Sequence, residues 1–149
     1  MPKFSKVLQV NHRASDMFAL VADVEQYPEF VPMCESLVIR SRRSRGDKER
    51  ILADMCVAYK IVRESFTSQV TLNQPKLLID VQYIDGPFRY LENNWRFIDE
   101  GDGRCIIHFK IDYEFKSRTL GLLMGAMFEK VFSKFTTAFE KRADEIYRR

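Results

Sequence analysis

Histidine and cysteine are the side chains best suited to nucleophilic or metal chemistry, and this chain of 149 residues has two histidines and three cysteines. The wide spacing of Cys34, Cys56 and Cys105, with no C-x-x-C pair, predicts neither a zinc site nor a disulfide framework. His12 falls at an expected turn, and His108 falls on the solvent side of an alternating strand. No Ser-His-Asp or Cys-His combination emerges from the pattern. We therefore predict no catalytic residue, no metal ligand and no enzymatic activity.

A second group of polar residues interrupts apolar strand faces. Glu64, Ser68 and Asn93 occupy positions whose neighbours two residues away are apolar. Burying such a group without a partner costs about 1–3 kcal/mol. Each therefore either faces a cavity, where water or a ligand satisfies it, or points outward because the strand register differs by one residue. Both interpretations stay open at this point.

The third feature is a basic segment, residues 40–50, in a chain whose formal net charge is only +3. Such a segment attracts the phosphates of ribosomal RNA or of an anionic membrane surface, or it is a solvated hairpin tip. It contains no aromatic residue, which argues against base stacking with a single strand. Its cations are Arg40, Arg42, Arg43, Arg45, Lys48 and Arg50.

The elements that position these residues follow from hydrophobic periodicity. A strand over residues 4–10 precedes a helix over residues 15–24, and Pro28 ends or restarts that helix, so that residues 27–32 form a short aromatic elbow. Residues 33–73 predict three strands, the run 77–84 a fourth, and two long strands follow, separated by a turn at residues 100–103. After Ser117 an apolar stripe without proline predicts a helix of roughly 32 residues, about 48 Å long.

This order predicts an α+β fold in one domain over residues 1–149: an antiparallel sheet of about seven strands wraps a long C-terminal helix, with a short helix pair after the first strand. The hydrophobic fraction of 46% is enough for a packed core. No apolar run approaches the roughly 20 residues of a membrane-spanning helix, and the N-terminus does not read as a signal peptide. We expect a cytoplasmic protein, and peripheral contact with the inner membrane stays open.

Three segments together resemble the coenzyme Q-binding and ribosome-association-toxin family of the START-like superfamily of polyketide cyclases, dehydrases and lipid transporters. The resemblance covers nearly the whole chain. Its segments are residues 23–34, which read DVEQYPEFVPMC, then Asp85-Gly86-Pro87-Phe88 with Leu91 and Trp95-Arg96-Phe97 behind it, and Ala138-Phe139-Glu140-Lys141-Arg142-Ala143.

The resemblance implies a START-like helix-grip fold that holds a hydrophobic ligand between the sheet and the long helix. In the respiratory branch the implied ligand is a polyprenyl quinone, ubiquinone, bound by a lipid-binding or chaperone protein that supports electron transport, with no cofactor besides it. In the other branch the implied partner is the large ribosomal subunit, and the implied effect is inhibition of subunit joining. The oligomeric state is left unpredicted.

The expected ligand-binding residues are mostly aromatic, and ordinary core packing is the competing interpretation for all of them. Trp95 is the most informative, because a buried indole N–H needs an acceptor and its flat face suits a quinone ring. The elbow at residues 27–31 and the helix start at residues 120–127 are the expected apolar rim for membrane access. The full set is Tyr27, Phe30, Val31, Phe66, Phe88, Leu91, Trp95, Phe97, Phe109, Tyr113, Met124, Met127 and Phe128.

Overall fold

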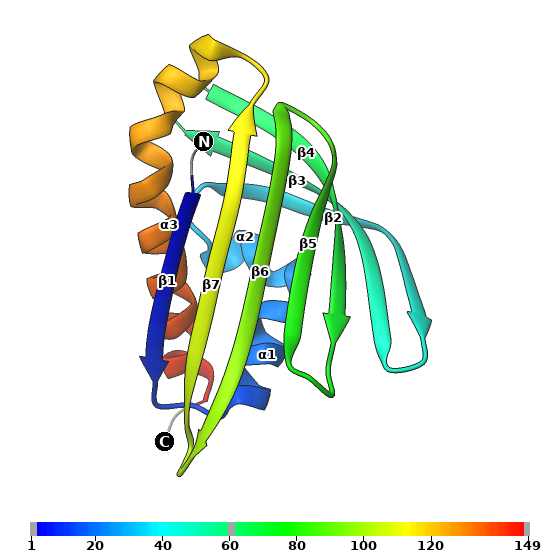
Figure 1. Ribbon diagram of the computed structural model, residues 1–149, viewed down its shortest axis with the longest axis vertical. Coiled ribbons are helices and arrows are strands. Elements are labelled where there is room, and N and C mark those ends of the chain that lie inside the picture. Colours follow the sequence, from blue (N-terminus) through cyan, green and yellow to red (C-terminus); the bar gives the residue numbers. More distant parts are fainter. Residues whose placement is uncertain (1–2, 60–61, 148–149) are drawn as a thin grey trace.

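The computed structural model describes residues 3–59 and 62–147, but not the side chains of residues 59, 62 and 124–129. Its strands form one antiparallel sheet (Figure 1). The seven strands lie in the order β1-β7-β6-β5-β4-β3-β2, so every strand from β2 onward pairs with the next one in sequence. Their bounds are β1 Lys3–Val10, β2 Cys34–Arg45, β3 Lys48–Tyr59, β4 Val62–Asn73, β5 Leu78–Asp85, β6 Phe88–Gly101 and β7 Arg104–Phe115.

The helices occupy the predicted places. Helix α1 (Ala14–Ala22) follows β1, and a 3-10 turn, η1 (Val24–Gln26), connects it to the one-turn helix α2 (Tyr27–Phe30). Pro28 lies in the first turn of α2, where its missing N–H costs no intrahelical hydrogen bond. Helix α3 (Arg118–Ile146) has 29 residues, and the Ser117 side chain caps its start by accepting from the Leu120 N–H at 3.2 Å. The α+β arrangement with a short helix pair is confirmed.

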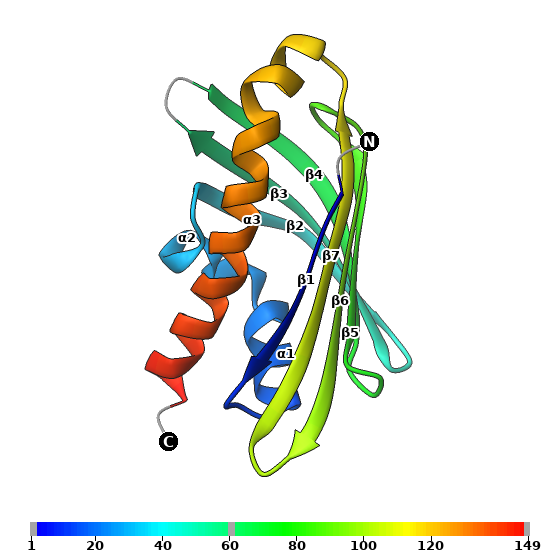
Figure 2. The same cartoon turned by 60° about the vertical axis from the view of Figure 1, so that its left-hand side comes forward.

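The sheet curves around α3, which runs along its concave side (Figures 1 and 2). Strand alternation explains the grip, because each strand turns one set of side chains toward the helix. In β6 the residues Leu91, Asn93, Trp95 and Phe97 are buried, whereas Arg96 is exposed. The expected parity of this strand is therefore confirmed.

Aromatic rings join the helices to the sheet. Phe139 on α3 is 1% exposed, and its ring centroid lies 5.3 Å from Tyr27, 5.0 Å from Phe30 and 5.2 Å from Trp95. Edge-to-face ring pairs of this kind each contribute about 0.5–1.5 kcal/mol beyond the area that they bury. The elbow that contains α2 is thus packed between the sheet and the C-terminal half of α3.

Gly86 lets the β5–β6 turn lie directly against β4. Its φ is +145°, and a Cβ atom at this position would lie 2.5 Å from the Phe66 Cβ, which is too close for any side chain. A register shift between Thr67 and Ser68 occurs beside it in the β4–β5 pairing. Glycine at this position therefore allows the turn to approach β4 closely at Phe66.

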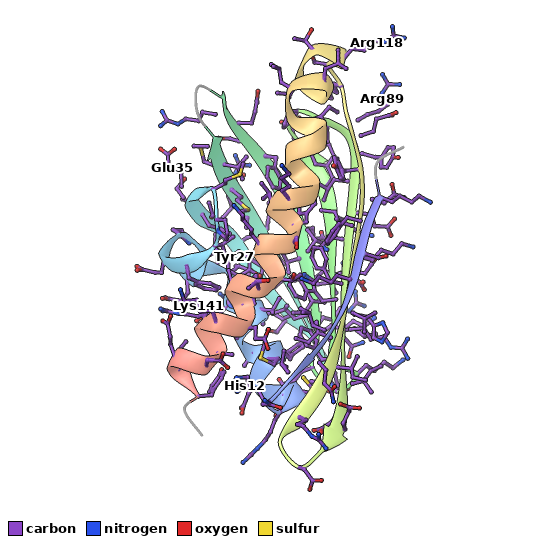
Figure 3. All side chains as sticks on the ribbon, turned by 90° about the vertical axis from the view of Figure 1, so that its left-hand side faces the viewer. His12, Tyr27, Glu35, Arg89, Arg118 and Lys141 are labelled. Atoms are coloured by element: carbon purple, nitrogen blue, oxygen red, sulfur yellow. The ribbon has the colours of Figure 1, made fainter. Side chains whose placement is uncertain are left out.

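The end of α3 is fixed to the first helix by polar contacts. His12 is 4% exposed and its Nε2 lies 2.7 Å from an Asp144 carboxylate oxygen, while the Tyr147 hydroxyl donates to the Asp16 carbonyl at 3.1 Å. Figure 3 shows His12 at this end of the molecule, away from the middle of α3. His12 is therefore part of the clamp that holds α3, and it is remote from the cavity described next.

Candidate functional site

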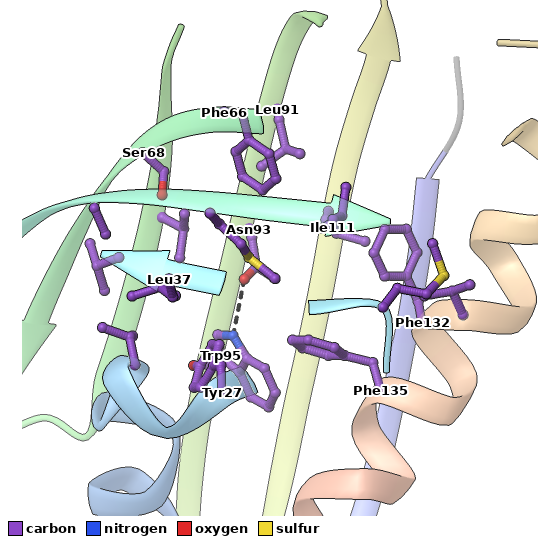
Figure 4. Close-up of a pocket in the computed structure, with 18 of the residues that line it drawn as sticks. Tyr27, Leu37, Phe66, Ser68, Leu91, Asn93, Trp95, Ile111, Phe132 and Phe135 are labelled. Carbon is purple, nitrogen blue, oxygen red and sulfur yellow. Dashed lines mark hydrogen bonds between the residues drawn. The ribbon is translucent and has the colours of Figure 1, made fainter. Parts of the chain in front are cut away.

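A cavity of about 130 Å³ lies between the concave face of the sheet, the elbow and the middle of α3 (Figure 4). The side chains around it are almost all aliphatic or aromatic. They are Val24, Tyr27, Pro32, Met33, Leu37, Ala53, Met55, Val57, Phe66, Ser68, Val70, Ile79, Val81, Phe88, Leu91, Asn93, Trp95, Phe109, Ile111, Val131, Phe132 and Phe135.

Asn93 forms a fixed polar point in this apolar wall. Its Nδ2 donates to the Lys110 carbonyl at 2.8 Å, and its Oδ1 accepts from the Trp95 Nε1 at 3.0 Å. An amide has a second N–H and its oxygen a second lone pair, so Asn93 keeps one donor and one acceptor for a molecule in the cavity.

Ser68 adds a second polar group, two strands away from Asn93. It is buried in the cavity wall, and no hydrogen bond joins its hydroxyl to another residue of the described chain. Ser68 and Asn93 therefore face the cavity, which was the first of the two interpretations of the sequence. Glu64 does not line it and is half-buried.

Tyr27 in the cavity wall and Cys34 beside it stay neutral at neutral pH. Burial raises the pKa of the Tyr27 hydroxyl far above its ordinary value, with smaller contributions from Cys34 and Asp23, and this hydroxyl donates to the Val21 carbonyl at 2.5 Å. Burial, assisted by Cys56, raises the pKa of the Cys34 thiol to about 11. Neither group supplies a nucleophile or a base at neutral pH.

Six of the expected ligand-binding residues line the cavity, from the three strands β4, β6 and β7 and from the elbow. Trp95 is 3% exposed, and its ring contacts those of Phe109 at 4.7 Å and Phe135 at 6.0 Å. The binding role of these residues stays a prediction. The six are Tyr27, Phe66, Phe88, Leu91, Trp95 and Phe109.

Two expected site residues lie in the core beside the cavity without lining it. Phe97 continues the cavity-facing side of β6, but Phe18 of α1 packs against it at 5.9 Å and Trp95 stacks on it, so both sides are occupied. Tyr113 is 2% exposed because Phe88 and Phe132 enclose it at 6.2 and 5.6 Å.

The elbow is only partly the expected rim. Val31 was expected on an exposed rim, and this is wrong: it is 5% exposed, because its N–H closes α2 by bonding to the Tyr27 carbonyl at 2.8 Å and the side chain turns inward. Phe30 is half-buried, packs on Phe139 and lies 5.3 Å from the Arg142 guanidinium, outside the cavity wall.

The expected rim on α3 is exposed only in part, because Leu120 is half-buried and packs against the core. Leu122 is 86% exposed and Leu123 is 59% exposed. The expected site residues Met124, Met127 and Phe128 lie outside the residues whose side chains are described.

Several lining residues were not in the expected set, although their pattern was visible. Ala53, Met55 and Val57 alternate along β3, and Phe132 and Phe135 belong to the apolar stripe of α3. Period-two alternation assigns a strand residue to a face, but it does not tell a cavity wall from a packed core. The alternation therefore identified the face of the sheet on which these residues lie, but not that a cavity adjoins them.

Other site types find no support among residues 3–59 and 62–147. No group of three or more His, Cys, Asp or Glu side chains there is arranged to hold a metal ion. All three cysteines are free thiols. No helix in the described ranges is long and apolar enough to span a membrane.

Comparison with known proteins gives a family match and two kinds of relative. Residues 10–140 match the family model for polyketide cyclase / dehydrase and lipid transport. The ribosome association toxin RatA of Escherichia coli K12 is 32% identical over 149 residues, covering 99% of this chain and 90% of the toxin. The mitochondrial coenzyme Q-binding protein COQ10 of Drosophila melanogaster is 32% identical over 139 residues, covering 91% of this chain and 56% of that protein.

Solved structures agree with the architecture. An 18 kDa protein from Caulobacter crescentus has a TM-score of 0.82 at 31% identity, with 99% of each chain covered. The Zhui aromatase/cyclase from Streptomyces sp. R1128 also reaches a TM-score of 0.82, at 15% identity over 99% of this chain and 96% of that enzyme, which shows a shared fold alone. The expected helix-grip architecture is confirmed.

Proposed function

The chain belongs to the polyketide cyclase / dehydrase and lipid transport family, and from that premise we propose that it binds a polyprenyl quinone without transforming it. The observation that carries this proposal is the apolar cavity with Asn93 and Ser68 in its wall. An apolar pocket with few polar groups suits a lipid-like ligand, whose carbonyls those groups orient. Among the described lining residues there is no His, Cys, Asp, Glu, Lys or Arg, which supports binding over catalysis.

The head group is the part of the ligand that fits the polar points. A quinone ring carries carbonyl acceptors, and the free amide N–H of Asn93 and the Ser68 hydroxyl are donors on one wall. The rings of Phe109 and Phe135, which contact Trp95 and each other, supply the aromatic surroundings.

The polyprenyl tail needs more room than the cavity offers. Pockets for drug-sized ligands usually measure about 300–1,000 Å³, against about 130 Å³ here. Half-buried lining residues occur on both sides of the gap between β2 and α3. They are Met33 before β2, Leu37 in β2, and Val131 and Phe132 in α3. We propose that the tail leaves the cavity between these elements.

Peripheral contact with a membrane would give the protein access to a ligand with such a tail. Leu122 and Leu123 are exposed beside Lys116 and Arg118, and Arg118 occupies the first turn of α3, where no acidic residue favours the helix dipole. Figure 3 shows Arg118 at the end of the molecule where α3 begins. Exposed leucines next to cations suit the surface of an anionic bilayer, and we propose the inner membrane as that surface, approached from the cytoplasm.

Ligand extraction tests the proposal. The protein is purified from a quinone-producing host, extracted with organic solvent, and analysed for quinone per mole of protein. Asn93→Leu is the test variant. Arg63→Gln is the control, because Arg63 is an exposed residue of β4 that does not line the cavity. Quinone is expected in the parent and the control and reduced in the test variant; extracts of the parent without quinone above background would overturn the proposal.

A second candidate is association with the large ribosomal subunit and inhibition of subunit joining. The relatives named as ribosome association toxins suggest it, and the basic segment at residues 40–50 is the observation in this chain that favours it. Co-sedimentation with purified large subunits at about 0.15 M salt tests it, since binding that rests only on diffuse phosphate attraction falls steeply with salt. Loss of all co-sedimentation at that salt concentration would overturn this candidate.

A further inference from the structure

A basic surface is formed by the end of the β2–β3 hairpin, residues 42–50, which we name the hairpin tip. Figures 1 and 2 show that it extends away from α3 at the edge of the sheet. None of its residues is apolar or aromatic. Its side chains therefore contribute little to the core, and their charges need a separate explanation.

Strand register sorts these charges onto two faces. Arg42 lies opposite Ile51, which is fully buried, so Arg42 and Glu49 share the concave face. There Arg42 is neutralised, with Glu49 at 2.8 Å and Glu25 at 3.5 Å.

The convex face has cations opposite cations. Arg43 pairs in register with Arg50. Two residues further along, Arg45 pairs with Lys48. Residues opposite each other in an antiparallel pair have Cβ atoms about 4.5–5.5 Å apart, and like charges at this spacing destabilise the hairpin. No ion pair within 4.0 Å relieves any of these four side chains in the described part of the chain. The two acids of the tip are Asp47 in the turn and Glu49, which pairs with Arg42.

We propose that the convex face of the hairpin tip binds the phosphate backbone of double-stranded RNA. This deepens the ribosome-association candidate and rests on it. Four clustered cations match closely spaced phosphates, and duplex RNA is recognised mostly through its shape and its phosphate and 2′-hydroxyl groups. A single strand is disfavoured because the tip has no ring on which a base stacks.

A membrane fits the tip less well than RNA does. Interfacial docking buries apolar side chains, which the tip lacks. The exposed Leu122 and Leu123 lie near the start of α3, and Figure 1 shows that α3 begins at the opposite end of the molecule from the tip. A membrane that docks through these leucines therefore meets a part of the molecule that is distant from the tip.

The test uses a fluorescently labelled RNA duplex of about 16 base pairs, the span of a typical duplex-binding domain, and anisotropy measured across a series of salt concentrations. The test variant is Arg43→Gln/Arg50→Gln. The matched control is Arg63→Gln/Arg89→Gln, which removes two equally exposed arginines that pair with Glu35 and Glu114. Thermal melting verifies that each variant folds, and relief of the Arg43–Arg50 repulsion should raise the melting temperature of the test variant by about 1–2 °C.

For the parent we expect log K to fall with log salt at a slope of about −4, one for each phosphate contact. In the test variant this slope should be less steep by about 2, and the affinity at 0.1 M salt should be lower by a factor of roughly ten or more. The control should match the parent in both slope and affinity. Equal slopes in parent and test variant, no duplex binding at low salt, or tighter binding of the corresponding single strand would overturn the proposal.

Two further outcomes separate this inference from the proposed functions. If the test variant loses binding to phosphatidylserine vesicles and keeps RNA binding, the tip is a membrane site and the inference is wrong. If the test variant still co-sediments with large subunits as the parent does, ribosome association stands but uses another surface, and the inference is wrong again. Quinone content of the test variant should equal that of the parent, because the tip does not line the cavity.

Discussion

The pair formed by Trp95 and Asn93 allows a quantitative test of how the cavity wall is built. The Trp95 indole donates to the Asn93 Oδ1 at 3.0 Å, and both residues are buried, at 3% and 8% exposed. Trp95→Phe keeps a ring among the neighbouring rings but removes the donor. Asn93→Leu keeps similar volume but leaves the indole N–H without its acceptor and the Lys110 carbonyl without its side-chain donor.

The expected magnitudes follow from leaving a buried partner unsatisfied. Each single change should lower the free energy of unfolding by about 1–3 kcal/mol. The double variant removes donor and acceptor together, so its loss should be smaller than the sum of the single losses by about 1–2 kcal/mol. Residues this close couple strongly, whereas independent sites add to within about 0.3–0.5 kcal/mol.

Urea denaturation followed by far-UV circular dichroism measures all four proteins on one scale, because the chain has a single tryptophan and fluorescence is lost in two of them. Arg96→Gln is the control, since Arg96 lies on the exposed face of the same strand; it should change stability by less than about 0.5 kcal/mol. Additive losses in the double variant would refute the reasoning, because the two side chains would then be satisfied independently.

Three further predictions concern the ligand, the membrane and the thiols. Quinone added to the protein should quench Trp95 fluorescence, and Ser68→Ala should weaken the binding measured this way by about 3- to 10-fold, the value of one neutral hydrogen bond; an unchanged Kd would remove Ser68 from the site. Leu123→Glu should reduce sedimentation with anionic vesicles and leave the melting temperature nearly unchanged, since Leu123 is 59% exposed; vesicle binding equal to that of the parent would argue against this rim. Burial raises the pKa values of Cys34 and Cys105 to about 11, so both thiols should resist alkylation at pH 8, and stability should fall as the pH rises from about 9 toward 11, where only the unfolded state ionises readily; rapid native-state alkylation of all three cysteines at pH 8 would contradict this.

The order of elements was accessible from the amino-acid pattern because it depends on local periodicity. Alternation in residues 104–115 and the stripe after Ser117 each require only neighbours within a few positions, and both elements form where they were expected. Pro28 marked the elbow for an equally local reason, its fixed φ. The family motifs lie on these same local features.

The composition of the cavity wall depended on contacts between segments far apart in the chain. Phe97 and Trp95 lie on the same face of β6. Phe18 of α1 covers Phe97, whereas the cavity adjoins Trp95. The sequence predicts Val31 in an exposed elbow. In the fold its N–H bonds to the Tyr27 carbonyl at the end of α2, and its side chain is buried in the core. Parity assigns a face, but only packing between the sheet and the helices determines which part of that face stays empty.

The basic segment illustrates the same division at the surface. Its excess of positive charge is a property of composition, and a count over residues 40–50 finds it. Whether those charges are neutralised depends on which strand residues lie opposite one another: Arg42 meets Glu49, and Arg43 meets Arg50. Coulomb energy falls with distance, and the distances between side chains on paired strands are set by register in the folded sheet.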